Sequence, residues 1–301
     1  MARNQNANPM YGQNKTDGVF SNKGRLDKSA GIPVQDANGI APVGGLIQPT
    51  YHTYHKGNAD NSPDGIDLSG ADPYAESATQ LFPYGSTLNW GDRVFVYGGI
   101  SSAGAVTAGK LVQQQVHVAN HSQMAATATT AAGETAISVE TVGTNMTLNQ
   151  YAGGYLYVND VDGEGQSMRV KSNPAHVHGT DPSVVITTYD PLVTALSTSS
   201  QLSIIANPYA DMVVAPAAET GAVTGVTNID MTASYFGWFQ IRGPKACLAD
   251  DTLVLGNNAV RGGSTAGAVG PGADNVLQPL GQVMASVVVD TEYALIWLNI
   301  V

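Results

Sequence analysis

The feature that most constrains this chain is the spacing of its turns. From about residue 90 to the end, clusters rich in Gly, Asn, Asp, Pro and Ser recur every 10–20 residues or so, and short segments of alternating apolar and polar residues lie between them. Alternation with a period of two places the apolar side chains on one face of a β-strand. The pattern predicts an all-β (mainly β) body of the β-sandwich or barrel type, joined to an extended N-terminal arm.

The clearest local structure is a β-hairpin. Residues 154–158 and 166–170 both alternate, and the connection NDVDGEG at 159–165 is made of turn-forming residues. A single helix is predicted at residues 74–81, with Asp72 as its N-cap and Pro73 at the first helical position. Only 12% of the residues are charged, too few to cover the surfaces of many helices. Further strands are predicted at residues 93–97, 111–118, 135–142, 184–189, 202–206, 212–214, 235–241, 283–289 and 293–301.

The chain divides into three predicted regions: an extended arm at 1–70, a β-rich domain at 71–215, and a β-rich segment at 216–301 that packs on the first domain or completes it. The arm lacks hydrophobic periodicity. Five basic and two acidic residues give positions 1–28 a charge of +3, which leaves −14 on the other 273 residues. A basic arm on an acidic body predicts contact with neighbouring subunits. The expected contact residues are Ile32, Val34, Leu46, Ile47, Tyr51, His52, Tyr54 and His55.

Charge and hydropathy limit the expected partners. The net charge of −11 argues against nucleic acid, because phosphate binding needs a basic surface. No run approaches the 18 or so apolar residues of a membrane span, and positions 1–28 contain no apolar stretch typical of a signal peptide. We therefore expect a soluble protein made in a cytoplasm, with no membrane partner.

The histidines are the first candidates for metal ligands. They fall in three pairs, His52 with His55, His117 with His121, and His176 with His178. On a strand, His176 and His178 would share one face, a spacing compatible with metal binding. No Cys, Asp or Glu stands at the spacing of a further ligand, so we predict no metal site and expect the histidines at a subunit interface.

Residues 159–164 resemble part of a calcium loop but lack its closing Glu, and a plain turn is the simpler interpretation. Metal binding at either place stays open.

No catalytic constellation is found, and we expect a protein that is neither an enzyme nor a cofactor binder. There is no Gly-x-Ser-x-Gly elbow, and the Gly-rich segment 262–267 lacks the Lys of a phosphate loop. Asp250 and Asp251 fall in a predicted turn without the buried surroundings that acid catalysis requires.

The one cysteine, Cys247, has apolar neighbours typical of a core. The aromatic segment 235–240 predicts a core strand, with a carbohydrate platform as the less favoured interpretation.

Several segments resemble the structural proteins of tailed-bacteriophage virions, of the capsid decoration or cement type. The resemblance covers roughly residues 75–301 and consists of strand-and-turn patterns without chemistry. The segments are ESATQLFPYG (76–85), WGDRVFVY (90–97), AGKLV (108–112), GGYLYVND (153–160), GEGQ (163–166), RVKS (169–172), GWFQIRG (237–243) and VVDTEYALIWL (288–298). The resemblance implies a β-sandwich or barrel subunit, often a homotrimer, on the capsid exterior.

The resulting expectation is a virion protein that binds the outside of the head shell and cross-links capsomers, with the major capsid protein and its own copies as partners. The arm would extend across neighbouring subunits. The first alternative is the major capsid protein itself, although the long amphipathic helix of that shell fold is not evident. The second is a tail or fibre subunit that binds a receptor or glycan through surface aromatics.

Overall fold

The computed structural model describes residues 68, 70–272, 278–285 and 290–300. The predicted arm lies almost entirely outside these residues, together with all eight contact residues proposed in it. The elements of the described part are β-strands, apart from one 3-10 turn, Ala119–His121 (η4). The all-β prediction is confirmed. In this part of the chain no helix has the length and apolar character needed to cross a bilayer.

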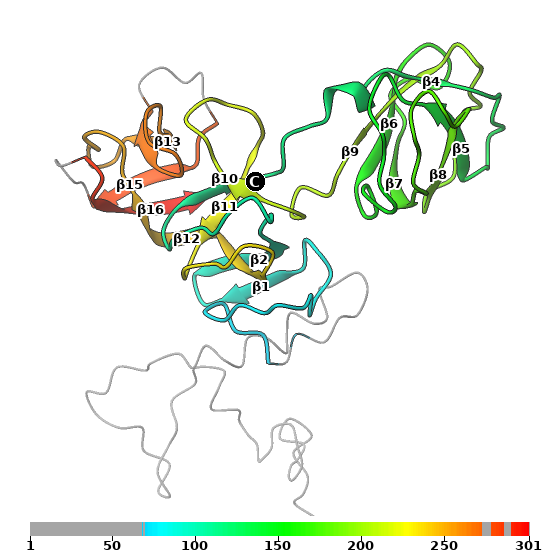
Figure 1. The fold of residues 1–301 in the computed structure, drawn as a ribbon. Helices are drawn as coiled ribbons and strands as arrows, with labels where there is room; N and C mark the ends of the chain where they lie inside the picture. Colours follow the sequence, from blue (N-terminus) through cyan, green and yellow to red (C-terminus); the bar gives the residue numbers. More distant parts are fainter. Residues whose placement is uncertain (1–67, 69, 273–277, 286–289, 301) are drawn as a thin grey trace, which may run out of the picture. The chain divides into compact units, whose positions relative to one another are not determined.

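Six antiparallel strands close into a barrel, drawn in green in Figure 1. Their order around the barrel is β4-β5-β8-β7-β6-β9. Closure pairs every strand on both sides and leaves no free edge. The strands are β4 (Met124–Ala126), β5 (Ala136–Glu140), β6 (Tyr155–Asp160), β7 (Ser167–Ser172), β8 (Val184–Thr188) and β9 (Gln201–Ile205).

The barrel core follows from the alternation of its strands. Along β6, Leu156 and Val158 are buried, whereas Tyr155 and Tyr157 are exposed. Neighbouring strands place their buried residues opposite one another, as Ile137 of β5 does with Ile186 of β8. Apolar side chains that are directly opposite on one face of a sheet pack together, so the register itself builds the core.

The predicted hairpin is confirmed. Strands β6 and β7 pair antiparallel, with Tyr155 opposite Arg169 and Tyr157 opposite Ser167. The connection contains three residues with positive φ, Val161 at 68°, Gly163 at 83° and Gly165 at 84°. Glycine adopts this conformation without steric cost, which explains why the turn is Gly-rich.

The remaining strands form an open sheet with the order β10-β3-β11-β12-β16-β15-β13-β14, to which β2 is joined through β12 and β1 through β2. The two long strands β12 and β16 lie next to each other and pair at seven positions, from Arg242 opposite Asn299 to Leu248 opposite Tyr293. The strands are β1 (Thr87–Trp90), β2 (Arg93–Gly99), β3 (Leu111–Gln113), β10 (Val213–Val214), β11 (Val223–Thr227), β12 (Phe236–Leu248), β13 (Asn258–Arg261), β14 (Val269–Pro271), β15 (Gly281–Ala285) and β16 (Tyr293–Asn299).

Along β16 the sheet buries one face in an apolar core, whereas β3 and β11 are buried on both faces. Ala294, Ile296 and Leu298 point into the apolar core from β16, and each is at most 1% exposed. Cys247 lies in the same core with no exposed surface, as its apolar neighbours predicted. Burial raises the pKa of its thiol to about 12. Such a thiol is protonated at neutral pH and therefore unreactive.

The predicted helix at 74–81 is wrong. Asp72 does accept a hydrogen bond from the Tyr74 N–H (2.9 Å), but the bond closes a local turn and no helix follows it. Ser77 instead exchanges two backbone hydrogen bonds of 2.9 Å with Phe236. The backbone groups that a helix would pair internally are thus used by a long-range bridge.

Strand boundaries differ from the predictions at several places. The segment 111–118 is a strand only to Gln113, and the strand predicted at 235–241 continues to Leu248. Strands β1, β4, β11, β13 and β14 were not predicted. The domain boundary predicted after residue 215 falls between β10 and β11, both of which pair with β3 in the open sheet.

Candidate functional site

The outward face of β16 carries a row of exposed apolar side chains. Tyr293, Leu295 and Trp297 are 49%, 36% and 41% exposed, and they alternate with residues buried in the core. Exposed apolar side chains are ordinary when they are scattered singly. Three in succession on one strand form a continuous row, and such rows are typical of binding surfaces.

The neighbouring strand β12 extends this row. Pro244 lies opposite Trp297, and Ala246 lies opposite Leu295. Because directly opposite residues share a face of the sheet, these five residues form one strip, which we call the β16 face. The hydroxyl of Tyr293 donates a hydrogen bond to the Ala108 carbonyl (3.1 Å), which fixes the orientation of its ring. The strip is therefore apolar and partly pre-organised.

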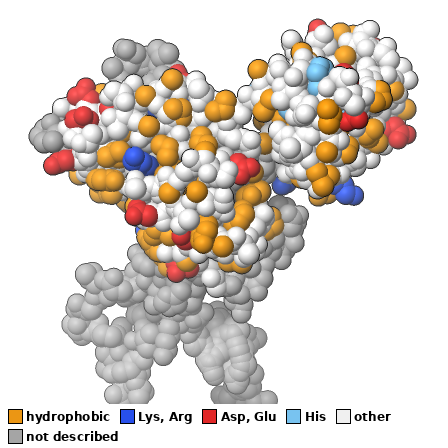
Figure 2. All heavy atoms as spheres, in the orientation of Figure 1, with side chains coloured by type: hydrophobic (Ala, Val, Ile, Leu, Met, Phe, Trp, Pro, Cys, Tyr) orange, Lys and Arg blue, Asp and Glu red, His pale blue; other side chains and the backbone are white. Residues whose placement is uncertain are grey.

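The face of the molecule in Figure 2 is poor in charge. Hydrophobic side chains are spread over its described part with few charged ones between them. This agrees with the low charged fraction of the sequence, 12%. A surface with few charges loses little hydration on contact, which favours association with other protein surfaces.

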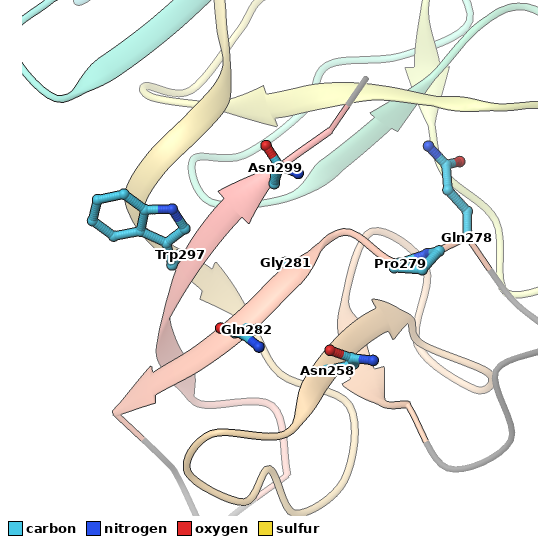
Figure 3. Close-up of a pocket in the computed structure, with 7 residues that line it drawn as sticks. All are labelled: Asn258, Gln278, Pro279, Gly281, Gln282, Trp297 and Asn299. Atoms are coloured by element: carbon cyan, nitrogen blue, oxygen red, sulfur yellow. The ribbon is translucent and has the colours of Figure 1, made fainter.

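Polar amides surround one end of the β16 face. Asn258 of β13 lies opposite Gln282 of β15, and Gln282 lies opposite Trp297, so the three side chains form a row across three strands. With Gln278, Pro279, Gly281 and Asn299 they line an open hollow of about 650 Å³ (Figure 3). A side chain at Gly281 would collide with the Trp297 carbonyl, so glycine is required there. An aromatic ring beside carboxamide groups can hold a sugar, because the ring stacks on its apolar face and the amides bond its hydroxyls.

The sequence missed Trp297 as a surface residue for a clear reason. Residues 293–298 are all apolar, so their composition resembles a strand buried on both faces. Only the structure shows that one side of β16 is open. The eight contact residues predicted in the arm lie outside the described residues.

The aromatic segment of β12 is core, as predicted. Trp238 is 3% exposed and Phe239 is fully buried. A Cβ on Gly237 would come within 2.8 Å of the Met231 methyl group, which confirms that this glycine permits close packing.

Asp250 lies in a bend, in agreement with the predicted turn, but the prediction that it lacks buried surroundings is wrong. The residue is 5% exposed. Its carboxylate accepts hydrogen bonds from the Ser264 N–H (2.8 Å) and the Ser264 hydroxyl (2.5 Å). Burial raises the pKa of this carboxyl, but the hydrogen bonds from Ser264 and Thr265 outweigh it, and the pKa is lowered. The Gly-rich segment 262–267 thus donates hydrogen bonds to the Asp250 carboxylate, which has a structural role.

Two of the histidine pairs lie among the described residues. His117 contacts the Ser122 hydroxyl, and His121 is buried against the Tyr151 hydroxyl. His176 and His178 meet the carboxylate of Glu140, which is far from them in sequence, and in the described part of the chain these three form the one group with metal-ligand geometry. The turn at 159–164 contributes no such group.

Comparison of the chain with protein-family models, with curated proteins and with solved structures finds no match. The functional argument therefore depends on the residues and their arrangement.

Proposed function

We propose that the chain is a structural subunit of a tailed-phage virion, a decoration or cement protein that binds the outside of the head shell and cross-links capsomers. The observation that carries this proposal is the β16 face, an exposed apolar strip built on the most extensively paired strands of the sheet. The strip overlaps the segment 288–298, one of those that resemble phage virion proteins. Its partners would be the major capsid protein and further copies of the chain, as a homotrimer.

The β16 face suits this role physically. A rigid sheet loses little conformational entropy on binding, because its side chains are already ordered. Aromatic residues at the centre of an interface usually contribute most of its binding energy. Repetition of one modest interface over a whole shell then supplies large collective stability. The predicted arm at 1–70 would provide the second contact that cross-linking requires.

We prefer this function to that of the major capsid protein because the described residues contain no α-helix. The shell fold of tailed phages was expected to need a long amphipathic helix.

The test is co-sedimentation of the purified chain with heads assembled from the shell gene of the same genome. We expect saturable binding. Trp297→Ala should weaken it by roughly 30-fold or more, since an aromatic hot spot contributes about 2 kcal/mol or more. Leu295→Asp should abolish it by placing a charge in the contact. Val193→Asp is the matched control, because Val193 is 82% exposed and lies in the barrel part of the chain. A genome without head genes, or equal binding by all variants, would refute the proposal.

A second candidate function is favoured by the amides around Trp297: a tail or fibre subunit that binds a receptor glycan. A glycan array on the intact chain distinguishes the two functions. Selective glycan binding that is lost in Trp297→Ala and in Gln282→Ala, without binding to heads, would favour the receptor-binding subunit.

A further inference from the structure

We propose that the barrel carries a metal site for a divalent transition-metal ion such as Zn²⁺, with Glu140, His176 and His178 as its ligands. Glu140 is the last residue of β5, and the two histidines belong to the segment between β7 and β8. Barrel closure brings these segments together although at least 36 positions separate them in the sequence.

The backbone around the ligands is held firmly. His176 exchanges two backbone hydrogen bonds with Met146, of 2.9 and 3.0 Å. The backbone N–H of His178 donates to the side-chain oxygen of Asn145 (2.9 Å). A metal site needs ligands whose positions are set before the ion arrives, and these contacts supply that rigidity.

The distances between ligand atoms fit a small ion. The Glu140 Oε1 atom lies 3.4 Å from His176 Nε2 and 3.1 Å from His178 Nδ1. All three ligand atoms lie within 4.8 Å of one another. Tetrahedral zinc with bonds of about 2.0–2.1 Å places its ligand atoms roughly 3.3 Å apart. Two of the separations therefore already match those of a coordinated ion.

The strongest observation is the state of His176. Its side chain is 1% exposed, and neither of its ring nitrogens makes a hydrogen bond. The 3.4 Å separation from Glu140 satisfies an ion-pair distance, but its geometry is not that of a hydrogen bond. The second carboxylate oxygen of Glu140 is also buried and without a hydrogen bond. Buried polar atoms are nearly always satisfied, so an imidazole nitrogen and a carboxylate oxygen left unsatisfied on neighbouring residues indicate a missing partner.

The surroundings provide the outer contacts that metal-bound histidines usually have. The Asp181 Oδ2 atom lies 3.9 Å from His176 Nδ1 and is fixed by the Val177 N–H (2.7 Å). A carboxylate beside the second nitrogen of a ligating histidine orients the ring and raises its basicity. The Thr141 hydroxyl lies 3.0 Å from His178 Nδ1, the nitrogen that faces Glu140, and this hydroxyl would have to turn away when the ion binds there.

The ligand set selects the class of ion. Two imidazole nitrogens and one carboxylate favour zinc and its neighbours over Ca²⁺ and Mg²⁺, which prefer all-oxygen sites. Three protein ligands leave a fourth position for water. The side chains of Glu140 and His178 are 28% and 37% exposed, so that position faces the surface. A bound ion would connect β5 to the 176–178 segment and stabilise the barrel.

The test is calorimetric titration of Zn²⁺ into the full chain after treatment with a chelator. Because His52 and His55 could bind zinc themselves, the titration is repeated in a His52→Ala/His55→Ala background. We expect one ion per chain in that background and a rise in melting temperature with zinc concentration. Ca²⁺ should produce neither effect.

Variants at the partly exposed Glu140 and the exposed His178 test the site without replacing the buried His176. Glu140→Gln and His178→Ala should each weaken zinc binding at least tenfold, and Asp181→Asn by about tenfold. His117→Ala is the matched control and should bind as the background does. Absence of stoichiometric binding, or binding that is unchanged in Glu140→Gln and His178→Ala, would overturn the site and leave the cluster as an ion pair of Glu140 with its histidines.

Discussion

The closed barrel and the open sheet expose apolar side chains in different ways. On the barrel, exposed Tyr155 lies opposite Arg169, and exposed Tyr157 lies opposite Ser167, so polar neighbours interrupt the apolar surface. On the sheet, Trp297 lies opposite Pro244 of β12, so the strip stays apolar on that side, and polar amides begin only on the other side at Gln282 of β15. The exposed apolar side chains of the β16 face are therefore more continuous than those of the β6–β7 hairpin, which agrees with the contact proposed for it.

The two regions also differ in their buried polar groups. In the sheet, both carboxylate oxygens of Asp250 accept a hydrogen bond from Ser264 in the 262–267 segment. In the barrel, His176 is buried with both ring nitrogens unpartnered. The sheet also holds one buried atom without a partner, Gln113 Oε1 of β3, but among the described residues only the unsatisfied atoms of the barrel lie beside further metal-ligating side chains. This difference supports the proposed ion site in the barrel.

The largest expected effect tests whether the two cores are independent. Ile137→Ala in the barrel and Ile296→Ala in the sheet each remove a fully buried side chain and should cost about 2–5 kcal/mol of stability. Amide hydrogen exchange should show lost protection in β5–β8 for the first variant and in β12–β16 for the second. Uniform loss of protection throughout the chain in both variants would contradict independent cores.

A smaller loss is expected from Asp250→Asn, because two hydrogen bonds to a charged acceptor are weakened. We expect about 2 kcal/mol, measured by denaturant unfolding at pH 7. The pKa of Asp250 is lowered from 3.8, so its contribution is present above that pH and is lost as the pH falls through the folded-state pKa. Asp251→Asn, at the exposed neighbouring residue, is the control and should change stability little.

The barrel should respond to acid earlier than the sheet. Burial lowers the pKa of His121 from 6.5, helped by the charges of His117 and His176, while a hydrogen bond to the Thr144 carbonyl opposes this. The unfolded chain thus binds a proton more readily, and the stabilising effect of neutral His121 is full above pH 6.5 and is lost as the pH falls below it.

This pH dependence is measured as barrel stability between pH 7 and pH 5 in the presence of a chelator. His121→Gln should flatten the slope. An unchanged slope in that variant would show that other groups cause it.

The smallest effect concerns Cys247. With its thiol buried and its pKa raised to about 12, alkylation at pH 8 should be very slow in the native chain and fast after unfolding. Ile296→Ala should accelerate the native reaction by opening the sheet core, and Ile137→Ala should not. Equal acceleration by both would again contradict the separation of the two cores.

Some of this molecule could be predicted from local sequence alone. The β6–β7 hairpin follows from two alternating segments around a Gly-rich turn, and the burial of Cys247 follows from its apolar neighbours. Both depend on residues that are close together in the chain. Local preference and tertiary structure agree there, so the pattern was sufficient.

Other features were decided only by the tertiary structure. Asp72 and Pro73 are sound helix signals, yet Ser77 pairs with Phe236 from a distant part of the chain, and that bridge replaces the helix. The apolar run of β16 does not reveal which of its faces is open. Glu140 meets His176 and His178 only because the barrel closes, and no sequence spacing encodes that meeting. The sequence by itself determined most of the strands, the β6–β7 turn and the all-β class, because these depend on neighbours in the chain. The binding face and the metal ligands depend on long-range pairing, and the fold alone decides them.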